Sequence, residues 1–191
     1  MPSGGEPLIL ASASPQRRAI LTQLGVRFEV RPADVDELSV GIPEEVAQAN
    51  ASRKASVIYA DAAPGSRVLG VDTLVTLDGE IFGKPADANA AATTLGRLAG
   101  RTHEVLSGIV LLGGGSRRPG GERMVSTRVS FRPLTPGQIE RYVATGEWRG
   151  RAGGYAIQER GAALVERIEG DYTNVVGLPV AALIELAGDL L

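Results

Sequence analysis

Residues 8–21 read LILASASPQRRAIL, a run that passes from apolar strand-forming residues through a serine-rich turn into a helix. Ser14 suits the N-cap of this helix, because its hydroxyl can accept a hydrogen bond from a free backbone N–H of the first turn. Pro15 suits the first helical position, where its missing donor costs nothing. The run therefore predicts a strand at residues 8–11 and a helix at residues 15–24.

Two arginines in the first turn of this helix, Arg17 and Arg18, carry the wrong charge for their position. Carboxylates are preferred near a helix N-terminus by about 0.3–1 kcal/mol, because the free amides there attract anions. One explanation is that a bound anion, most simply a phosphate, lies between the arginines and the amides. The other is that both arginines are solvated on an amphipathic helix, and this run alone does not choose between the two.

The composition limits the class of protein. The 191 residues are 43% hydrophobic and 22% charged, which is enough for one compact domain over residues 1–191. The net charge of −2 gives no basic field for nucleic acid or an anionic membrane, so we expect neither as a partner. Because the sequence has no cysteine, disulfides, cysteine nucleophiles and thiolate metal sites are excluded. No run has the layout of a signal peptide or the length of a membrane span, which predicts a soluble cytoplasmic protein.

Strand and helix patterns alternate along the chain, and no linker is long enough to separate two independent domains. Asp78-Gly79 is a strong hairpin signal, and hairpins beside crossover helices predict an α/β protein with a mixed sheet. The expected strands are residues 8–11, 28–31, 68–76, 80–82, 102–112, 123–132 and 163–168. The expected helices are residues 15–24, 43–60, 87–98, 135–145 and 179–191. A glycine-rich loop at residues 113–121 is expected to join two of the strands.

Several kinds of chemistry are excluded by what the sequence lacks. The run Gly79-Glu-Ile-Phe-Gly-Lys84-Pro85 is one residue too short for a Walker A loop and ends in proline. A Ser–His–Asp triad would have to use His103, the only histidine, but no nucleophile elbow is present. We interpret His103 as a strand or edge histidine without a catalytic role. A bound metal would have to be a hard cation on oxygen ligands, such as Mg²⁺ or Mn²⁺.

Four charged residues are candidates for a site. Asp72 lies inside a run of apolar strand-forming residues, where a carboxylate costs several kcal/mol unless it is paired or bound to a metal. It is either part of a site or a residue at the edge or end of a strand that caps a neighbouring amide. Lys84 is either a cation positioned by the following proline or a solvated lysine. Glu37, in an acidic loop, and Lys54, in a predicted helix, are either site residues or solvated surface residues.

A second informative region covers residues 151–161 and 168–179. Its paired glycines allow a close approach of the backbone to a ligand. Gln158 offers both a donor and an acceptor, as do the side chains that read the edges of nucleic-acid bases. Together with the residues already discussed, this region predicts one nucleotide site, to which we assign Ser12, Arg17, Asp72, Thr73, Lys84 and Gln158.

Six short motifs make the chain similar to a known family: Leu10-Ala-Ser12-Ala-Ser14-Pro15-Gln-Arg17, Gly70-Val-Asp72-Thr73, Gly83-Lys84-Pro85, Ser130-Phe-Arg132-Pro-Leu134-Thr135, Ala152-Gly-Gly-Tyr155-Ala-Ile157-Gln158 and Val176-Gly177-Leu178-Pro179. In this order they resemble the Maf family of nucleotide pyrophosphatases. The resemblance implies a twisted mixed sheet flanked by helices, as in inosine-triphosphate pyrophosphatases, with a cleft between two lobes. It also implies cleavage of a nucleoside triphosphate to the monophosphate and pyrophosphate, with a divalent cation.

The resemblance also implies roles for individual residues. Asp72 matches the family's proton acceptor, and Glu37 and Asp72 are the expected metal ligands. Residues that match the phosphate and metal side of the family's site are Ser12, Arg17, Glu37, Lys54 and Lys84. Thr73 and Gln158 match the specificity positions of the branch that acts on dTTP and UTP, rather than the branch that acts on 7-methyl-GTP.

Two positions depart from the pattern of the dTTP/UTP branch. Gln16 stands where arginine is usual, which removes a cation that Arg18 would have to replace. Glu159 stands where glycine is usual, and it could narrow the base pocket or add negative charge. The alternatives are a pyrophosphatase of broad or modified-nucleotide preference, such as 7-methyl-GTP, and a nucleotide-binding regulator of cell division without hydrolysis. A homodimer is expected only as the commonest state of soluble oligomers.

Overall fold

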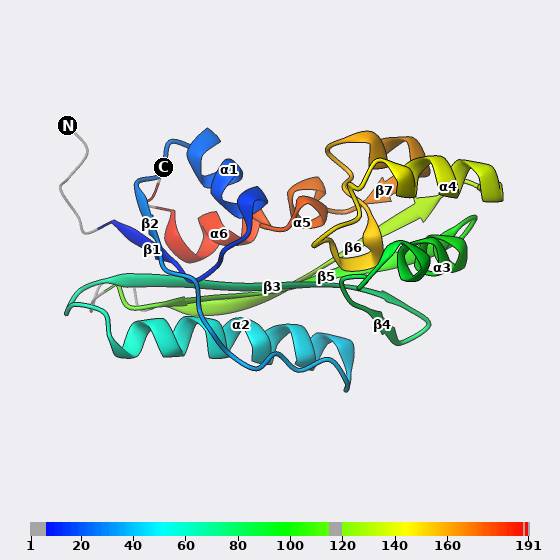
Figure 1. The fold of residues 1–191 in the computed structure, drawn as a ribbon. Coiled ribbons are helices and arrows are strands. Elements are labelled where there is room, and N and C mark those ends of the chain that lie inside the picture. The colour runs from blue at the N-terminus through cyan, green and yellow to red at the C-terminus, as the bar shows by residue number, and fades with distance from the viewer. Residues whose placement is uncertain (1–6, 115–119, 189, 191) are drawn as a thin grey trace.

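The computed structural model describes residues 7–114, 120–188 and 190. Within these residues the chain forms a seven-stranded sheet in the order β2-β1-β3-β5-β6-β7, with β4 paired to β3 (Figure 1). β1 pairs in parallel with β2 and β3, and the other pairs are antiparallel, which confirms the expected mixed sheet. The strands are β1 (Leu8–Leu10), β2 (Phe28–Val30), β3 (Arg67–Leu77), β4 (Glu80–Phe82), β5 (Thr102–Leu112), β6 (Gly121–Phe131) and β7 (Val165–Glu169).

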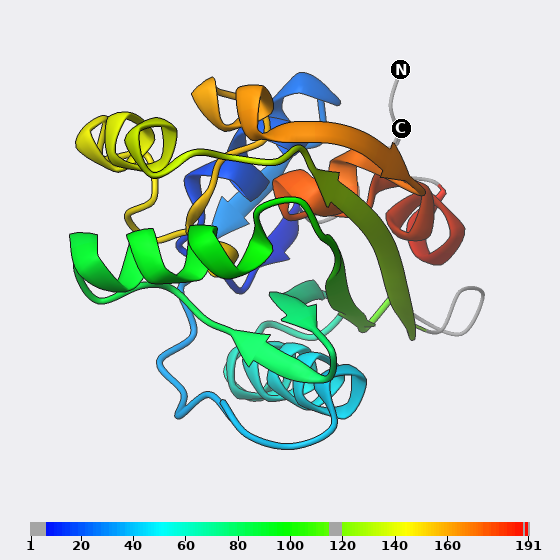
Figure 2. The ribbon, with the colours of Figure 1, turned by 90° about the vertical axis from the view of Figure 1, so that its right-hand side faces the viewer.

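Helices cover both faces of this sheet. α2 lies alone along one face of the long strands β3 and β5, while α1, α5 and α6 lie over the other face (Figure 1). Figure 2 shows the opposite end of the molecule from the termini, where α3 and α4 lie side by side. The helices are α1 (Pro15–Gln23), α2 (Pro43–Ala60), α3 (Ala88–Leu98), α4 (Pro136–Ala144), α5 (Tyr172–Val176) and α6 (Val180–Ala187).

The expected elements are confirmed, with ends that differ by one or two residues in most cases. The closing helix is shorter than the expected range 179–191, because α6 ends at Ala187. The sequence did not predict α5 or the 3₁₀ turns η1 (Ala152–Gly154) and η2 (Arg160–Leu164). Of the expected glycine-rich loop, residues 115–119 lie outside the described residues.

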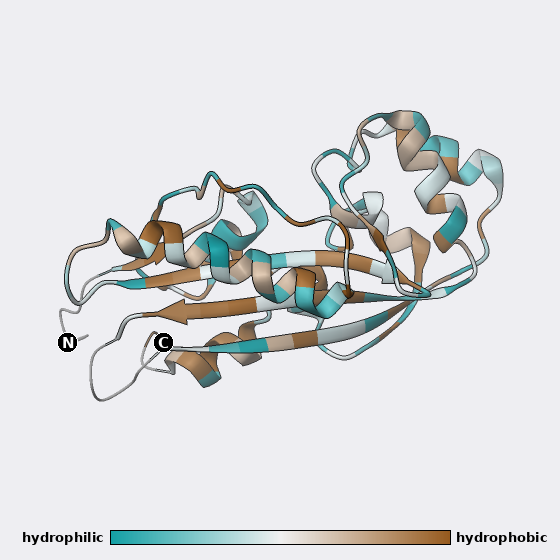
Figure 3. Cartoon of the chain, turned by 90° about the horizontal axis from the view of Figure 1, so that it is seen from below, coloured by the Kyte–Doolittle hydropathy of each residue, from teal (hydrophilic) through white to brown (hydrophobic). Residues whose placement is uncertain are grey.

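Two separate apolar clusters pack against the same face of the sheet and form two lobes. One cluster joins α1 and α6 to β1 and the first half of β3, and includes Leu21, Leu69 and Leu183. The other joins α3 and α4 to the second half of β3, and includes Leu95 and Tyr142. Figure 3 shows long apolar stretches on the central strands that both lobes share. None of the helices in the described part of the chain is long and apolar enough to cross a membrane.

α2 packs unusually close to the sheet because two strand residues have no side chain. A Cβ atom at Gly70 of β3 would lie 2.3 Å from the carbonyl oxygen of Ala51, and one at Gly108 of β5 would lie 2.5 Å from that of Ala47. The side chains of Ala47 and Ala51 are fully buried in this contact. The polar residues on the same helix face are therefore held within reach of β3.

His103 belongs to the second lobe's core. It lies in β5, an interior strand between β3 and β6. The expected strand position is therefore confirmed, and the residue is not at the edge of the sheet. Its Nε2 is 2.9 Å from the hydroxyl of Tyr155, and its ring packs edge-on against Phe131. Burial lowers the pKa of His103 from 6.5 to about 4, so this side chain is neutral at physiological pH.

Candidate active site

A cleft of about 660 Å³ lies between the two lobes, a size typical of small-molecule sites. It is lined by every residue that the sequence analysis assigned to the site, namely Ser12, Arg17, Glu37, Lys54, Asp72, Thr73, Lys84 and Gln158. These residues come from segments far apart in the sequence, and the fold brings them to one place. The expected cleft between two lobes is thus confirmed.

The cleft lies at a gap in the edge of the sheet. β1 pairs with β3 as far as Leu69, and β4 pairs with the same edge only from Val75. Between these points this edge of β3 has no neighbouring strand in the described part of the chain. Because side chains alternate along a strand, Asp72 and Thr73 point to opposite faces of the sheet. Both still line the cleft, since it passes around the open edge.

The turn between β1 and α1 forms one wall of the cleft. As predicted, Ser14 is the N-cap of α1, with Pro15 in the first turn. Its hydroxyl accepts from the backbone N–H of Arg17 at 3.5 Å, and its own N–H donates to Ser12 Oγ at 3.2 Å. Arg18 is exposed and does not line the cleft, so it does not replace the arginine missing at Gln16.

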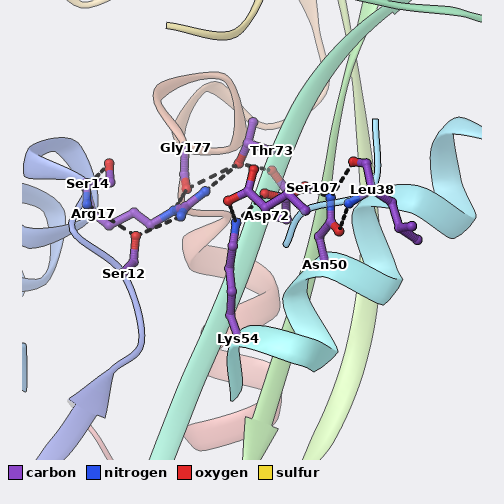
Figure 4. A network of polar contacts seen from close by, with 11 residues as sticks. Ser12, Ser14, Arg17, Leu38, Asn50, Lys54, Asp72, Thr73, Ser107 and Gly177 are labelled. Carbon is purple, nitrogen blue, oxygen red and sulfur yellow. Dashed lines mark hydrogen bonds and ion pairs between the residues drawn. The ribbon is translucent and has the colours of Figure 1, made fainter. Parts of the chain in front are cut away.

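Arg17 turns back from α1 into the protein and is only 8% exposed, so for this residue the solvated alternative was wrong. Its Nε donates to the carbonyl of Gly177 at 2.8 Å, its Nη1 to Ser12 Oγ at 2.9 Å and its Nη2 to Thr73 Oγ1 at 3.1 Å (Figure 4). A guanidinium group has five N–H bonds, so these contacts leave two for a ligand. Burial lowers the pKa of Arg17, and the carboxylates of Asp72 and Glu37 act in the opposite direction.

On the other face of β3, Asp72 forms a nearly buried ion pair. Its Oδ1 lies 2.6 Å from Lys54 Nζ, which also lies 2.6 Å from Glu37 Oε1. Its Oδ2 accepts a hydrogen bond from Asn50 Nδ2 at 3.1 Å (Figure 4). Asp72 lies inside β3, where it pairs with Gly108, and beside the open edge of that strand, so the edge position is met and the strand-end position is not. Its carboxylate contacts the side chains of Asn50 and Lys54 on α2. The carboxylate is held by two donors, as burial requires.

The remaining cations line the cleft from the second lobe. Lys84 is exposed and has no side-chain hydrogen bond or ion pair to any residue that the structure describes. Arg149 and Arg151 also line the cleft, and the sequence analysis did not single out either. Their position beside the glycine-rich stretch was the only available signal.

The paired glycines Gly153 and Gly154, and Glu159, all lie outside the lining of the cleft. Gly153 and Gly154 do not line the cleft: a Cβ at Gly153 would meet Val75 Cγ2 at 2.8 Å, and one at Gly154 would meet Pro85. The expectation that these glycines admit a ligand was therefore wrong, since they admit neighbouring parts of the protein. Glu159 also does not line the cleft, and Arg151 Nη2 lies 3.5 Å from its Oε1.

Residues that the sequence analysis missed complete the polar network. Asn50 is 2% exposed and bonds both Asp72 and the backbone of Leu38. Ser107 Oγ lies 2.8 Å from Thr73 Oγ1, its partner in the neighbouring strand. Asn50 precedes Lys54 by four residues on α2, and this helical spacing is a signal that could have identified it.

The carboxylates of the cleft are too few to hold a metal ion without further ligands. In the described residues, no group of three or more His, Asp or Glu side chains could hold a metal ion. Glu37 and Asp72 offer two carboxylates, one on each side of the Lys54 ammonium. Mg²⁺ is commonly bound by one or two carboxylates together with substrate phosphates. The two carboxylates therefore fit a cation shared with a phosphate, rather than one held by the protein alone.

Comparison with known proteins identifies the family. The family described as Maf-like protein matches residues 7–190. A dTTP/UTP pyrophosphatase of Symbiobacterium thermophilum is 47% identical over 186 residues, which cover 95% of this chain and 92% of that protein. One from an Anaeromyxobacter species is 50% identical over 185 residues, covering 94% and 87%. A solved dITP/XTP pyrophosphatase from Mycobacterium abscessus has a TM-score of 0.43 at 18% identity, covering 68% of this chain and 76% of that chain. The family match spans nearly the whole sequence, and the chain belongs to the Maf family.

Proposed function

We propose that this protein hydrolyses a nucleoside triphosphate to the monophosphate and pyrophosphate, with dTTP and UTP as preferred substrates. The observation that carries the proposal is a carboxylate, Asp72, fixed by two donors at the wall of a cleft that also contains Arg17 and Lys84. Relatives that are 47% and 50% identical over almost the full chain bear the name dTTP/UTP pyrophosphatase.

In the proposed reaction, a water molecule attacks the α-phosphorus and Asp72 accepts its proton. The bond from the α-phosphorus to the bridging oxygen breaks, and pyrophosphate leaves. Arg17, Lys54 and Lys84 would neutralise phosphate oxygens, while Ser12 and the first amides of α1 would hold one of them. The chain has no cysteine and its single histidine is buried and neutral, so we assign the role of base to a carboxylate. Such a base contributes about 10²–10⁴-fold in rate.

The proposal includes a divalent cation, Mg²⁺ or Mn²⁺. Glu37 and Asp72 are the side chains that would hold it, and its charge would stabilise the leaving pyrophosphate. Lys54, which lies between the two carboxylates, limits how much negative charge they present to the cleft.

Gln158 is the residue that we assign to the base. It lines the cleft, and its Nε2 lies 3.5 Å from Glu159 Oε1, which supports an orientation with the amide carbonyl as the free acceptor. An acceptor at this place suits the N–H group on the pairing edge of thymine and uracil. Thr73, the other specificity position, lines the cleft and is hydrogen-bonded to Arg17 and Ser107.

The test is a panel of triphosphates incubated with the protein and Mg²⁺ or Mn²⁺, with both products identified. We expect pyrophosphate and the monophosphate, released fastest from dTTP and UTP. Faster hydrolysis of purine triphosphates or 7-methyl-GTP would support the broad or modified-nucleotide alternative. Nucleotide binding without any hydrolysis would support a regulator of cell division instead.

The proposal extends to the organisation of the protein. We propose a single domain over residues 1–191, located in the cytoplasm, and a homodimer as its state in solution. Light scattering during size-exclusion chromatography would give the oligomeric state directly.

A further inference from the structure

The loop that carries Glu37 is held by one helix. Residues 31–42 contain no helix or strand, yet Glu37 must be placed accurately to meet Lys54. Three side chains of α2 contact three successive residues of this loop. Arg53 Nη1 donates to the carbonyl of Asp36 at 3.0 Å, Lys54 pairs with Glu37, and Asn50 binds Leu38.

Asn50 is the buried member of this set, and every polar atom of its amide is used. Its Oδ1 accepts from the N–H of Leu38 at 2.8 Å, and its Nδ2 donates to the carbonyl of Leu38 at 3.0 Å. The same Nδ2 donates to Asp72 Oδ2 at 3.1 Å (Figure 4). A rotated amide would place a donor against an N–H and an oxygen against a carboxylate, so only one orientation fits.

This geometry links the two carboxylates of the site through a neutral group. Glu37 and Asp72 lie on a loop and on a strand, and both contact Lys54. Asn50 bonds the residue next to Glu37 and also bonds Asp72 itself. Because an amide carries no charge, it adds donors without changing the balance between the carboxylates and the cations.

We propose that Asn50 is a positioning residue that holds Glu37 and Asp72 in their catalytic arrangement on either side of Lys54. This role rests on the proposed pyrophosphatase function. Misplacement of reacting groups by about 1 Å can cost on the order of 10²-fold in rate, even where substrate binding is kept. Asn50 acts through Glu37 and Asp72, and needs no contact with the substrate.

The principal variant is Asn50→Leu, which keeps the branching and the number of heavy atoms of the side chain and removes its hydrogen bonds. We expect kcat to fall about tenfold or more and KM to change less than about threefold, because positioning acts on the chemical step. The matched control is Gln48→Leu, which removes an amide from the same helix. Gln48 bonds Glu122 and does not line the cleft, so its kinetics should stay near those of the wild type.

The hydrogen-exchange rate of the Leu38 amide reports how firmly the loop is held, and it depends neither on catalysis nor on a metal. In the wild type, the Leu38 amide is bonded to Asn50 and should exchange slowly. In Asn50→Leu its exchange should be about tenfold faster or more, and in Gln48→Leu it should be unchanged. Asn50→Asp is a second variant of nearly identical shape that keeps the acceptor for Leu38 N–H but sets a carboxylate against Asp72. It should retain slow Leu38 exchange and still lose turnover.

A double-mutant cycle separates positioning from general stabilisation. If Asn50 acts through Glu37, then Asn50→Leu should lower kcat less in a Glu37→Gln background than in the wild type. Equal losses in both backgrounds would contradict the proposal, as would unchanged Leu38 exchange or unchanged kcat in Asn50→Leu. If the wild type releases pyrophosphate and Asn50→Leu has the same kcat, the positioning role is overturned and the proposed function is not. A wild type that releases no pyrophosphate overturns the proposed function and this role with it.

Discussion

The ammonium group of Lys54 lies 2.6 Å from Asp72 Oδ1, so the carboxylate that we assign as the base is already paired with a cation of the protein. Both side chains are about nine-tenths buried. Lys54 also contacts Glu37, so it remains paired when Asp72 is neutralised. Asp72 can therefore be replaced by a neutral residue without leaving the buried ammonium group of Lys54 unpaired.

Asp72→Asn should lower kcat by about 10²-fold or more, because it removes the proton acceptor and keeps the shape of the side chain. Nucleotide affinity, measured without the divalent cation that Asp72 would help to hold, should stay nearly unchanged. Pyrophosphate release and equilibrium nucleotide binding measure the two effects separately. Asp78→Asn, at an exposed aspartate that pairs with Arg101, is the control and should be as active as the wild type. Near-normal turnover in Asp72→Asn would remove Asp72 from the role of base.

Arg17→Lys should weaken both folding and substrate binding. A lysine keeps the charge but lacks the planar fork that contacts Gly177, Ser12 and Thr73 together. We expect the free energy of unfolding to fall by about 1.5–3 kcal/mol and KM to rise about tenfold or more. Urea denaturation and steady-state kinetics provide the measurements. The control is Arg18→Lys, at an exposed position, which should change neither the free energy of unfolding nor KM. Equal values of both quantities in the two variants would refute the role of Arg17.

Gln158→Ala should reduce the preference for dTTP and UTP over purine triphosphates more than it reduces the best rate. Loss of the single hydrogen bond from the base to the Gln158 carbonyl costs about 0.5–1.5 kcal/mol, so the ratio of kcat/KM values should narrow by up to about tenfold. Gln48→Ala removes an amide outside the cleft and should keep the wild-type ratio. An unchanged ratio in Gln158→Ala would assign base recognition to other residues.

His103 predicts a specific pH dependence of stability. Its pKa is lowered to about 4 in the folded protein, so the unfolded chain binds a proton below about pH 6.5 that the folded protein does not. This contribution to stability is complete above pH 6.5 and is lost as the pH falls toward 4, by about 1.4 kcal/mol per pH unit. The free energy of unfolding, measured by urea denaturation across this range, should therefore decline more steeply for the wild type than for His103→Gln. Parallel curves would show that His103 does not titrate in this way.

Gly70→Ala should damage the site from a distance. The added Cβ would meet the carbonyl of Ala51 and push α2, with Asn50 and Lys54, away from β3. We expect a loss of about 1–3 kcal/mol in unfolding free energy and a lower kcat. Gly96→Ala is the control, because Gly96 is exposed on α3 and the nearest atom to its added Cβ is 4.0 Å away. A Gly70→Ala protein with normal stability would mean that α2 can pack farther from the sheet.

The parts of the fold that depend on local chemistry could be predicted from the sequence. Ser14 and Asp87 are the N-caps that their side chains suggest, and β4 follows the Asp78-Gly79 turn. The five-residue helix α5 was missed because so short a segment has no periodic pattern to detect. The role of Gly153 and Gly154 was wrong because a sequence shows where a side chain is missing but not which neighbour uses the space.

The candidate site was predicted as a set of residues, but not as a network. Motif positions identified Asp72, Lys54 and Arg17, and all line the cleft. The partners of these residues depend on contacts between distant segments, such as Asn50 with Leu38 and Asp72, which no local pattern contains. The gap in the sheet edge beside Asp72 likewise depends on the lengths of β1 and β4.

The hydrogen bond from Arg17 to Gly177 spans 160 residues and has a consequence for the order in which the protein is made. A chain is synthesised and begins to fold from its N-terminus, so α1 can form long before its arginine has this acceptor. Until Gly177 has been added, Arg17 lacks the contact that helps to direct it into the cleft. Partly synthesised chains, and chains cut before this residue, should therefore carry nearly all the motif residues and yet lack a finished phosphate-binding site.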